Sequence, residues 1–185
     1  MSDLAILTRA ALTAAEAHKG QTRKGGEMPY VNHVIEVAHL VAEAGGTPEM
    51  VAAALLHDTV EDTGATAEAI EAAFGPCIAT LVAGLSDPPG WEGLGRAERK
   101  RRQAQHMATA PRAIRRIKIA DQTSNVRDVG RLPAGWEPAD ARAYSAGAAK
   151  VVDACRGADP GLEALFDAAR AEALATLDAI QKGER

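Results

Sequence analysis

The chain has 185 residues, of which 46% are hydrophobic and 3% aromatic, and its formal net charge at pH 7 is −4. This length predicts one domain spanning residues 1–185, and the hydrophobic content excludes a disordered chain. The acidic balance argues against nucleic acid or a membrane surface as the main partner, although it leaves room for a local basic pocket that binds a small anion. Homo-oligomerisation remains open at this stage.

The cysteine pattern and the first residues indicate where the protein works. Cys77 and Cys155 stand far apart with no CxxC motif, which argues against a disulfide scaffold or a zinc–cysteine site. The N-terminal residues lack a basic segment followed by an apolar run, so we expect no signal peptide. No stretch is long and apolar enough to predict a membrane span. These features predict a cytoplasmic protein.

The periodicity of apolar residues predicts an all-α protein built as a single helical bundle. Alanine is abundant, and it favours helices far more than it favours strands. Glycine and proline divide the chain into segments, with a polar, glycine-rich loop at 20–30 and a connector at 133–138. Asn32, Thr47 and Thr66 are expected to begin helices. Asn32 is a good N-cap type, Thr47 is the N-cap before Pro48, and an acidic first turn follows Thr66. In chain order, the predicted helices cover 3–19, 32–45, 48–59, 66–74, 76–86, 111–130, 139–155 and 160–180, with a strongly basic stretch at 96–107.

The most informative cluster of ionisable residues closes an apolar helix. His57 and Asp58 follow the run Val51–Leu56, and Glu61 and Asp62 come directly after. A His–Asp pair alone is more commonly a helix-capping device than a site, and a solvated helix end would account for the acids. However, three carboxylates repel one another unless a cation neutralises them, and acids at a helix C-terminus oppose the helix dipole. The cluster therefore favours a metal site.

Two further positions extend this cluster. Asp121 lies in an apolar stretch, and helical spacing places Lys118 and Asn125 on the same face. A buried aspartate requires a cationic partner or a metal, although a surface Asp–Lys pair would give the same pattern. His33 begins another helix, where it would serve equally well as a capping or core residue. Together His33, His57, Asp58 and Asp121 offer mixed nitrogen and oxygen ligands, a set that suits Mn²⁺ or Fe²⁺ and, less specifically, Zn²⁺ or Mg²⁺.

The order His…His–Asp…Asp resembles the HD phosphohydrolase superfamily. Three strings, Gly20–His33, Ala53–Thr63 and Lys118–Asp128, are similar to the hydrolase domain of the RelA/SpoT homologues. The similarity covers about residues 5–155, with the predicted helix 160–180 beyond it. No synthetase domain follows in this sequence, so it looks like the stand-alone small alarmone hydrolases, a group that includes the metazoan SpoT homologues.

The resemblance implies roles for particular residues. It makes His33, His57, Asp58 and Asp121 the ligands of one divalent metal ion, for which Mn²⁺ is expected, and Glu61 and Asp62 the catalytic acids. It also implies substrate contacts, which are Arg23, Lys24, Asn125 and Tyr144. The implied reaction is removal of the 3′-pyrophosphate from (p)ppGpp, a nucleotide alarmone of the stringent response, which gives pyrophosphate and GDP or GTP.

The sequence departs from the family pattern at three positions. Val34 replaces the usual proline, Gln122 replaces a basic residue, and Met28 is an extra loop residue. Two alternatives therefore stay open: an HD enzyme for another nucleotide or for the 2′-phosphate of NADPH, and a non-catalytic alarmone sensor. Retention of Glu61 and Asp62 argues against the sensor.

The basic run in 96–107 also has two interpretations. It supplies countercharge for an anionic substrate, or it is a solvated helix face, which is the more common role of such a run. Trp91 and Trp136 are expected to anchor loops rather than to stack on a base. The basic residues of this run are Arg96, Arg99, Lys100, Arg101 and Arg102.

Overall fold

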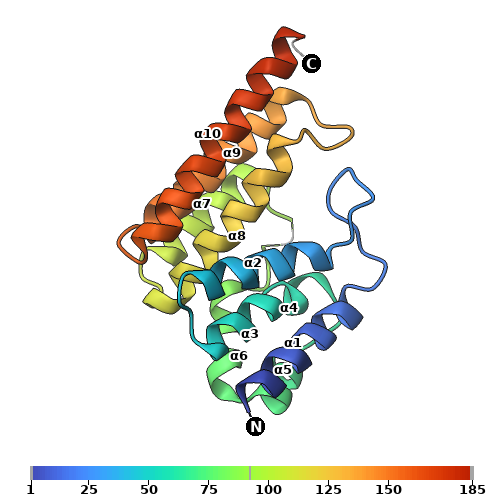
Figure 1. Cartoon of the computed structure of the whole chain (residues 1–185), viewed down its shortest axis with the longest axis vertical. Coiled ribbons are helices and arrows are strands. Elements are labelled where there is room, and N and C mark those ends of the chain that lie inside the picture. The colour runs from blue at the N-terminus through green and yellow to red at the C-terminus, as the bar shows by residue number, and fades with distance from the viewer. Residues whose placement is uncertain (1, 92, 184–185) are drawn as a thin grey trace.

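A computed structural model describes residues 2–91 and 93–183, and its regular elements are all helices (Figure 1). The all-α prediction is therefore confirmed for this part of the chain. None of these helices is long and apolar enough to cross a membrane. The helices are α1 (Asp3–Ala17), α2 (Val31–Glu43), α3 (Pro48–Leu56), α4 (Thr59–Asp62), α5 (Ala67–Phe74), α6 (Pro76–Leu85), α7 (Arg96–Met107), α8 (Arg112–Gly130), α9 (Pro138–Cys155) and α10 (Pro160–Lys182).

Helix α8 is the central element of the bundle. It packs against α10 and α9 on one side and against α2 and α6 on the other (Figure 1). Its apolar residues, among them Ile117, Ile119 and Val126, are part of the main core. The same helix also buries polar side chains, namely Lys118, Asp121, Gln122, Thr123 and Ser124. Because burying unpaired polar groups is costly, this stretch requires partners from neighbouring helices.

The break between α3 and α4 differs from the continuous helix expected over 48–59. Helix α3 ends at Leu56, His57 and Asp58 form a turn, and α4 begins at Thr59. Consecutive residues of an unbroken helix point in different directions, because each residue turns the chain by about 100°. The turn instead lets His57 and Asp58 face the same interior space. At the other end of α3, the predicted Thr47 cap is confirmed, since its Oγ1 accepts from the Met50 N–H.

The start of α2 corrects another expectation. Asn32 is not the N-cap: Tyr30 already has helical backbone angles, and α2 begins at Val31. The turn at Pro29 and Tyr30 starts the helix early, because the His33 N–H donates to the Tyr30 carbonyl. This register places His33 in the buried first turn of α2.

Two loops meet on the side of the molecule where α2 begins and α8 ends (Figure 1). The loop between α1 and α2 carries Arg23 and Lys24, and the loop between α8 and α9 carries Trp136. The Ala134 N–H donates to the Gly25 carbonyl at 3.0 Å. Gly25 has φ +68°, and a Cβ there would lie 2.5 Å from the Ala134 carbonyl oxygen. Glycine therefore permits both the turn and the contact between the loops.

Candidate active site

The turn between α3 and α4 orients one imidazole for ligation. His57 is 1% exposed, and its Nδ1 lies 2.8 Å from the Ala54 carbonyl oxygen. A carbonyl only accepts hydrogen bonds, so Nδ1 carries a proton, and in the neutral imidazole Nε2 presents its lone pair. This Nε2 has no hydrogen-bond partner in the described residues, although Asp58 Oδ2 lies 3.0 Å away.

His33 from α2 is oriented in the same manner. Its Nδ1 lies 2.9 Å from Ser124 Oγ, and that hydroxyl donates its own proton to Glu36 Oε2 at 2.6 Å. The His33 Nδ1 is therefore the donor to Ser124, so in the neutral imidazole the lone pair is on Nε2. The free Nε2 lies 3.5 Å from Asp58 Oδ2 and 3.5 Å from Asp121 Oδ1.

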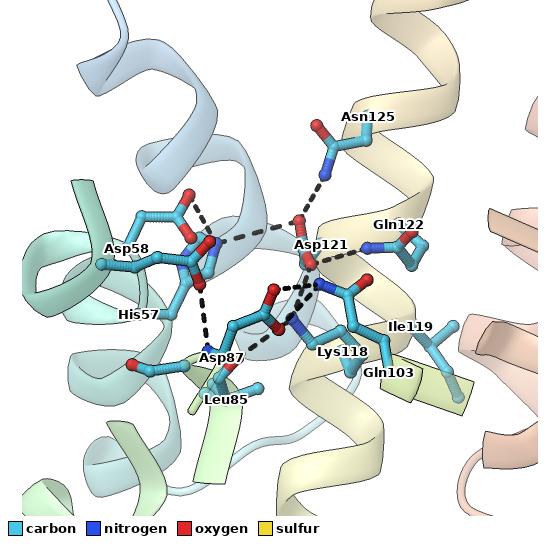
Figure 2. A network of polar contacts seen from close by, with 12 residues as sticks. His57, Asp58, Leu85, Asp87, Gln103, Lys118, Ile119, Asp121, Gln122 and Asn125 are labelled. Atoms are coloured by element: carbon cyan, nitrogen blue, oxygen red, sulfur yellow. Dashed lines mark hydrogen bonds and ion pairs between the residues drawn. The ribbon is translucent and has the colours of Figure 1, made fainter. Parts of the chain in front are cut away.

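Asp121 completes the cluster from α8. Its Oδ1 lies 3.8 Å from His57 Nε2, and Figure 2 shows this carboxylate between the His57 turn and three donors of its own helix. Lys118 Nζ and Gln122 Nε2 lie 3.1 and 2.8 Å from Oδ2, and the Asn125 amide donates to Oδ1. Lys118 and Asn125 therefore share the face of Asp121, as helical spacing predicted.

The donor set fits a divalent cation. His33, His57 and Asp58 place ligand atoms within 4.8 Å of one another, and Asp121 Oδ1 faces both imidazoles. Two imidazole lone pairs beside two carboxylates are stable only with a positive charge between them. In the metal-free protein, burial lowers the pKa of His57, but Asp58 and Asp121 outweigh burial and raise it to about 10. A divalent cation bound between the carboxylates would supply this positive charge while both imidazoles stay neutral.

The two predicted catalytic acids lie beside this cluster in different environments. Glu61 forms an ion pair with Arg99 and accepts from the Asp87 N–H at 3.1 Å. Asp62 Oδ2 lies 2.8 Å from the Tyr30 hydroxyl, which is also 2.7 Å from Asp58 Oδ2. Burial, and then the Asp58 charge, raise the pKa of Asp62. Asp62 is therefore the better proton carrier of the pair.

A cavity of about 360 Å³ opens onto the cluster. All four predicted substrate contacts line it, namely Arg23, Lys24, Asn125 and Tyr144, together with the carboxylates Asp58, Glu61, Asp62 and Asp121. The Arg23 guanidinium is held in the wall by an ion pair with Asp128 and by a 2.8 Å hydrogen bond to Asn125 Oδ1. The structure thus brings residues of five separate segments to one polar cavity.

A larger cavity of about 670 Å³ lies on the other side of the Glu61–Arg99 ion pair. Its lining is mainly apolar, with Ile70, Val82 and Trp91 among its residues. Its lining includes neither Asp58 nor Asp121, and none of the four predicted substrate contacts, all of which line the smaller cavity. The candidate active site is therefore the smaller, polar cavity.

Among the residues that line the polar cavity, sequence reasoning missed Tyr30, whereas Arg99 and Lys100 belong to the basic run already offered as countercharge. Tyr30 contacts two carboxylates, Arg99 holds Glu61, and Lys100 is a buried lysine that donates to Gln122 Oε1 at 2.7 Å. Tyr30 had a detectable signal, because it stands in the string that resembles the family. The basic run divides into two groups. Arg96, Arg99 and Lys100 line the cavity, whereas Arg101 and Arg102 pair with Glu98 on the outside.

The two tryptophans contact charged side chains of α7. Trp136 stacks edge-to-face with Tyr144, and the Arg96 guanidinium lies 4.4 Å above its ring. The Arg102 guanidinium carbon lies 5.6 Å from the centroid of the Trp91 ring. Both contacts join a loop to a helix, which agrees with the anchoring role expected for these residues.

Comparison with known proteins places the chain in a family. The profile of the "HD domain" family matches residues 10–151. The guanosine-3′,5′-bis(diphosphate) 3′-pyrophosphohydrolase MESH1 of Danio rerio is 38% identical over 166 residues, which cover 88% of this chain and 91% of the relative. MESH1 of Drosophila melanogaster is 42% identical over 158 residues, covering 83% and 87%.

A solved structure shows the same arrangement of the whole chain. It is described as "A metazoan ortholog of SpoT hydrolyzes ppGpp and plays a role in starvation responses" and superimposes with a TM-score of 0.83 at 37% identity. The match covers 98% of this chain and 97% of the other. The chain therefore belongs to the HD domain family and groups with its MESH1 members.

Proposed function

We propose that this protein is a metal-dependent phosphohydrolase that removes the 3′-pyrophosphate of (p)ppGpp and releases pyrophosphate and GDP or GTP. One observation carries the proposal: two imidazole Nε2 atoms and two carboxylates converge beside a cation-lined cavity. The MESH1 relatives are named for this reaction and cover nearly the whole chain.

His33, His57, Asp58 and Asp121 would hold the metal, for which we propose Mn²⁺. A divalent ion bound there lowers the pKa of a water molecule and polarises a phosphate. Lys118, Gln122 and Asn125 hold Asp121 in place, and Ser124 and the Ala54 carbonyl fix the two imidazoles. These outer contacts preset the ligand geometry.

The acid pair would move protons during the reaction. A water oxygen forms a bond to the phosphorus next to O3′, and the bond between that phosphorus and O3′ breaks. Asp62, whose pKa is raised, accepts the proton that the water loses, and the departing O3′ takes a proton from a protonated carboxyl or from solvent. Glu61, fixed by Arg99 and the Asp87 N–H, would orient the water. Arg23, Lys24, Asn125 and Tyr144 would contact the substrate.

The remaining proposals concern the protein as a whole. We propose that residues 1–185 act as one domain, because α10 packs along α8 and α9. A cytoplasmic location is supported by the unpaired cysteines Cys77 and Cys155. The acidic net charge supports a small-molecule substrate rather than nucleic acid or a membrane.

A competition assay tests the function. Purified protein loaded with Mn²⁺ receives ppGpp, NADPH and dGTP, and chromatography resolves the products. We expect the highest kcat/KM for ppGpp, with GDP and pyrophosphate as products. Preference for NADPH or dGTP would leave metal-dependent hydrolysis standing and contradict the alarmone as substrate. Binding of ppGpp without turnover of any compound would identify a sensor.

A further inference from the structure

The two histidines of the cluster are held by acceptors of different kinds. His57 Nδ1 faces the Ala54 carbonyl, which can only accept, so the backbone fixes which nitrogen of the neutral ring carries the proton. His33 Nδ1 faces Ser124 Oγ at 2.9 Å, and a hydroxyl can either accept or donate. Whether the neutral His33 presents a lone pair or a proton at Nε2 therefore depends on what else the Ser124 hydroxyl contacts.

The second contact of that hydroxyl is Glu36. His33 and Glu36 lie one turn apart on α2, and Ser124 and Arg127 lie one turn apart on α8, which packs against α2. Ser124 Oγ donates to Glu36 Oε2 at 2.6 Å, and Arg127 donates to Glu36 Oε1 at 2.6 Å. Burial alone would raise the pKa of Glu36, but the hydrogen bonds from Ser124 and Arg127 lower it below its usual value. Glu36 is therefore an ionised carboxylate, which only accepts.

The carboxylates of the cluster act on His33 in the opposite direction. Its Nε2 lies 3.5 Å from Asp58 Oδ2 and 3.5 Å from Asp121 Oδ1, so without a metal ion these acids favour a proton on Nε2. A neutral imidazole with that proton must accept at Nδ1, and the Ser124 hydroxyl would then turn away from Glu36. The carboxylate would lose a short, charge-assisted hydrogen bond and face an oxygen lone pair 2.6 Å away. Glu36 thus disfavours the tautomer that cannot bind a metal ion.

The Glu36–Arg127 ion pair lies outside the polar cavity. It lines a groove of about 320 Å³ between α2, α8 and α10, where the Glu36 side chain is 33% exposed and that of Arg127 31%. Ser124, which lies between this pair and His33, is 1% exposed. A chain of hydrogen bonds, the Glu36–Ser124–His33 relay, therefore runs from a surface groove to a buried imidazole without entering the polar cavity.

We propose that Glu36 is a positioning residue which, through Ser124, keeps the proton of the neutral His33 imidazole on Nδ1 and so reserves Nε2 for the metal ion. Arg127 supports this role by holding Glu36 ionised. The inference rests on the metal site of the proposed function and deepens it. It predicts that metal affinity depends on the direction of a hydrogen bond to which neither the metal nor the substrate contributes.

Glu36→Gln should reverse the relay. The Arg127 guanidinium only donates, so it attracts the amide oxygen of the glutamine, and the amide N–H then faces Ser124. The hydroxyl must donate to His33 Nδ1, which places the proton on Nε2. Calorimetry with Mn²⁺ should show binding weakened about 10-fold relative to wild type. The matched control is Glu43→Gln, at an exposed glutamate of the same helix, which should bind Mn²⁺ like wild type.

Two double variants distinguish the relay from a simple loss of negative charge. Ser124→Ala should also weaken Mn²⁺ binding about 10-fold, and adding Glu36→Gln should cause no further loss, because the hydroxyl that transmits the effect is gone. Adding Arg127→Met to Glu36→Gln should restore affinity to within about 3-fold of wild type, since the amide can then turn its oxygen to Ser124. Arg127→Met alone should change affinity less than about 2-fold.

The opposite pattern would overturn the proposal. Additive losses in the Ser124→Ala and Glu36→Gln pair would show that Glu36 acts through space by its charge. A gain in affinity with Arg127→Met alone that matches the loss in Glu36→Gln would show the same.

NMR of ¹⁵N-labelled, metal-free protein reads the His33 tautomer directly, and the reading depends on neither metal binding nor turnover. At a pH where this imidazole is neutral, we expect the proton on Nδ1 in wild type and on Nε2 in Glu36→Gln. The same tautomer in both proteins contradicts the relay. If wild type shows the expected tautomer and binds Mn²⁺ but cleaves no nucleotide, the proposed reaction fails and the relay stands.

Discussion

The proposed metal ligands and the proposed catalytic acids have different local contacts, so their substitution should have different consequences. We expect Asp121→Ala or His57→Ala to reduce metal content from about one ion per chain to nearly none, together with activity. The reason is that each change removes a ligand and leaves its outer partners, such as Lys118, facing an incomplete site. Elemental analysis of the purified variants measures this. The control is Asp140→Asn, an exposed carboxylate on α9, and full occupancy in Asp121→Ala would disprove its assignment as a ligand.

Substitutions of Glu61 and Asp62 should lower turnover without removing the metal ion. Glu61→Gln and Asp62→Asn keep the size of each side chain, so metal content should stay close to wild type while kcat falls by about 100-fold or more. Steady-state kinetics and elemental analysis on the same preparations give both values. Near wild-type kcat in both variants would rule out proton transfer by the pair and leave Glu61 as a partner of Arg99 only.

A site residue can be predicted from the sequence when its local sequence context is unusual. His57, Asp58 and Asp121 interrupt apolar helical runs, and a charge in such a run requires a partner. Lys100 has no such mark, since it stands in a run of basic residues that reads as a solvated surface. Only packing of α7 against α9 shows that Lys100 points inward whereas Arg101 points outward. Contacts between helices that are distant in sequence determine which of the two side chains points inward. The local periodicity of the sequence does not reveal such contacts.

At the scale of elements, sequence patterns located the helices better than the turns that shape the site. Caps and proline marked the starts of α3 and α5 because these signals are local. The division of α3 from α4 has no glycine or proline to mark it. It follows from partners on α8 and α2, since His57 and Asp58 must both face Asp121 and His33. Long-range contacts thus outweighed the helix propensity of residues 48–59.

The contact between the two loops gives a prediction at this scale. Gly25→Ala would place a methyl group 2.5 Å from the Ala134 carbonyl at a positive φ, so the loops must separate. We expect a loss of about 1–2 kcal/mol in stability and a rise in KM that exceeds the fall in kcat, because Arg23 and Lys24 lose their positions. Thermal unfolding and kinetics measure both effects.

The neighbouring glycine provides a matched control for the loop. At Gly26 φ is not positive, and a Cβ would approach no atom more closely than 3.9 Å, so Gly26→Ala should behave like wild type. If Gly25→Ala and Gly26→Ala have equal KM values, the contact between the loops does not position the substrate residues.

At the scale of the whole molecule, an acidic protein with net charge −4 concentrates cationic side chains in one cavity. One of these cations, Lys100, is buried, and a buried charge without an ionic partner lowers stability. Sites built for binding or catalysis commonly carry this cost. The structure makes the cost measurable at Lys100, the one buried lysine of the cavity that lacks an ion pair among the described residues.

Burial lowers the pKa of Lys100 to about 8, against an ordinary value of 10.5, although Asp121 opposes the shift. The unfolded chain therefore binds this proton more tightly than the folded protein. Between pH 8 and 10.5 the unfolded state holds more protons, so this group makes stability rise with pH. Below pH 8 the lysine is charged in both states, and its cost of about 3 kcal/mol is constant.

Lys100→Met removes the titration and should change the pH dependence in a defined direction. Without substrate, the variant should gain most relative to wild type at pH 7, and the gain should shrink as pH rises from 8 to 10.5. Urea unfolding of both proteins at each pH measures the difference, and subtraction cancels the tyrosine and cysteine groups that titrate in the same range. Lys150→Met, at an exposed lysine of α9, is the control and should show no such trend. A difference that stays constant from pH 7 to 10.5 would mean that the folded protein does not lower the pKa of Lys100. The charge of Lys100 would then cost no stability.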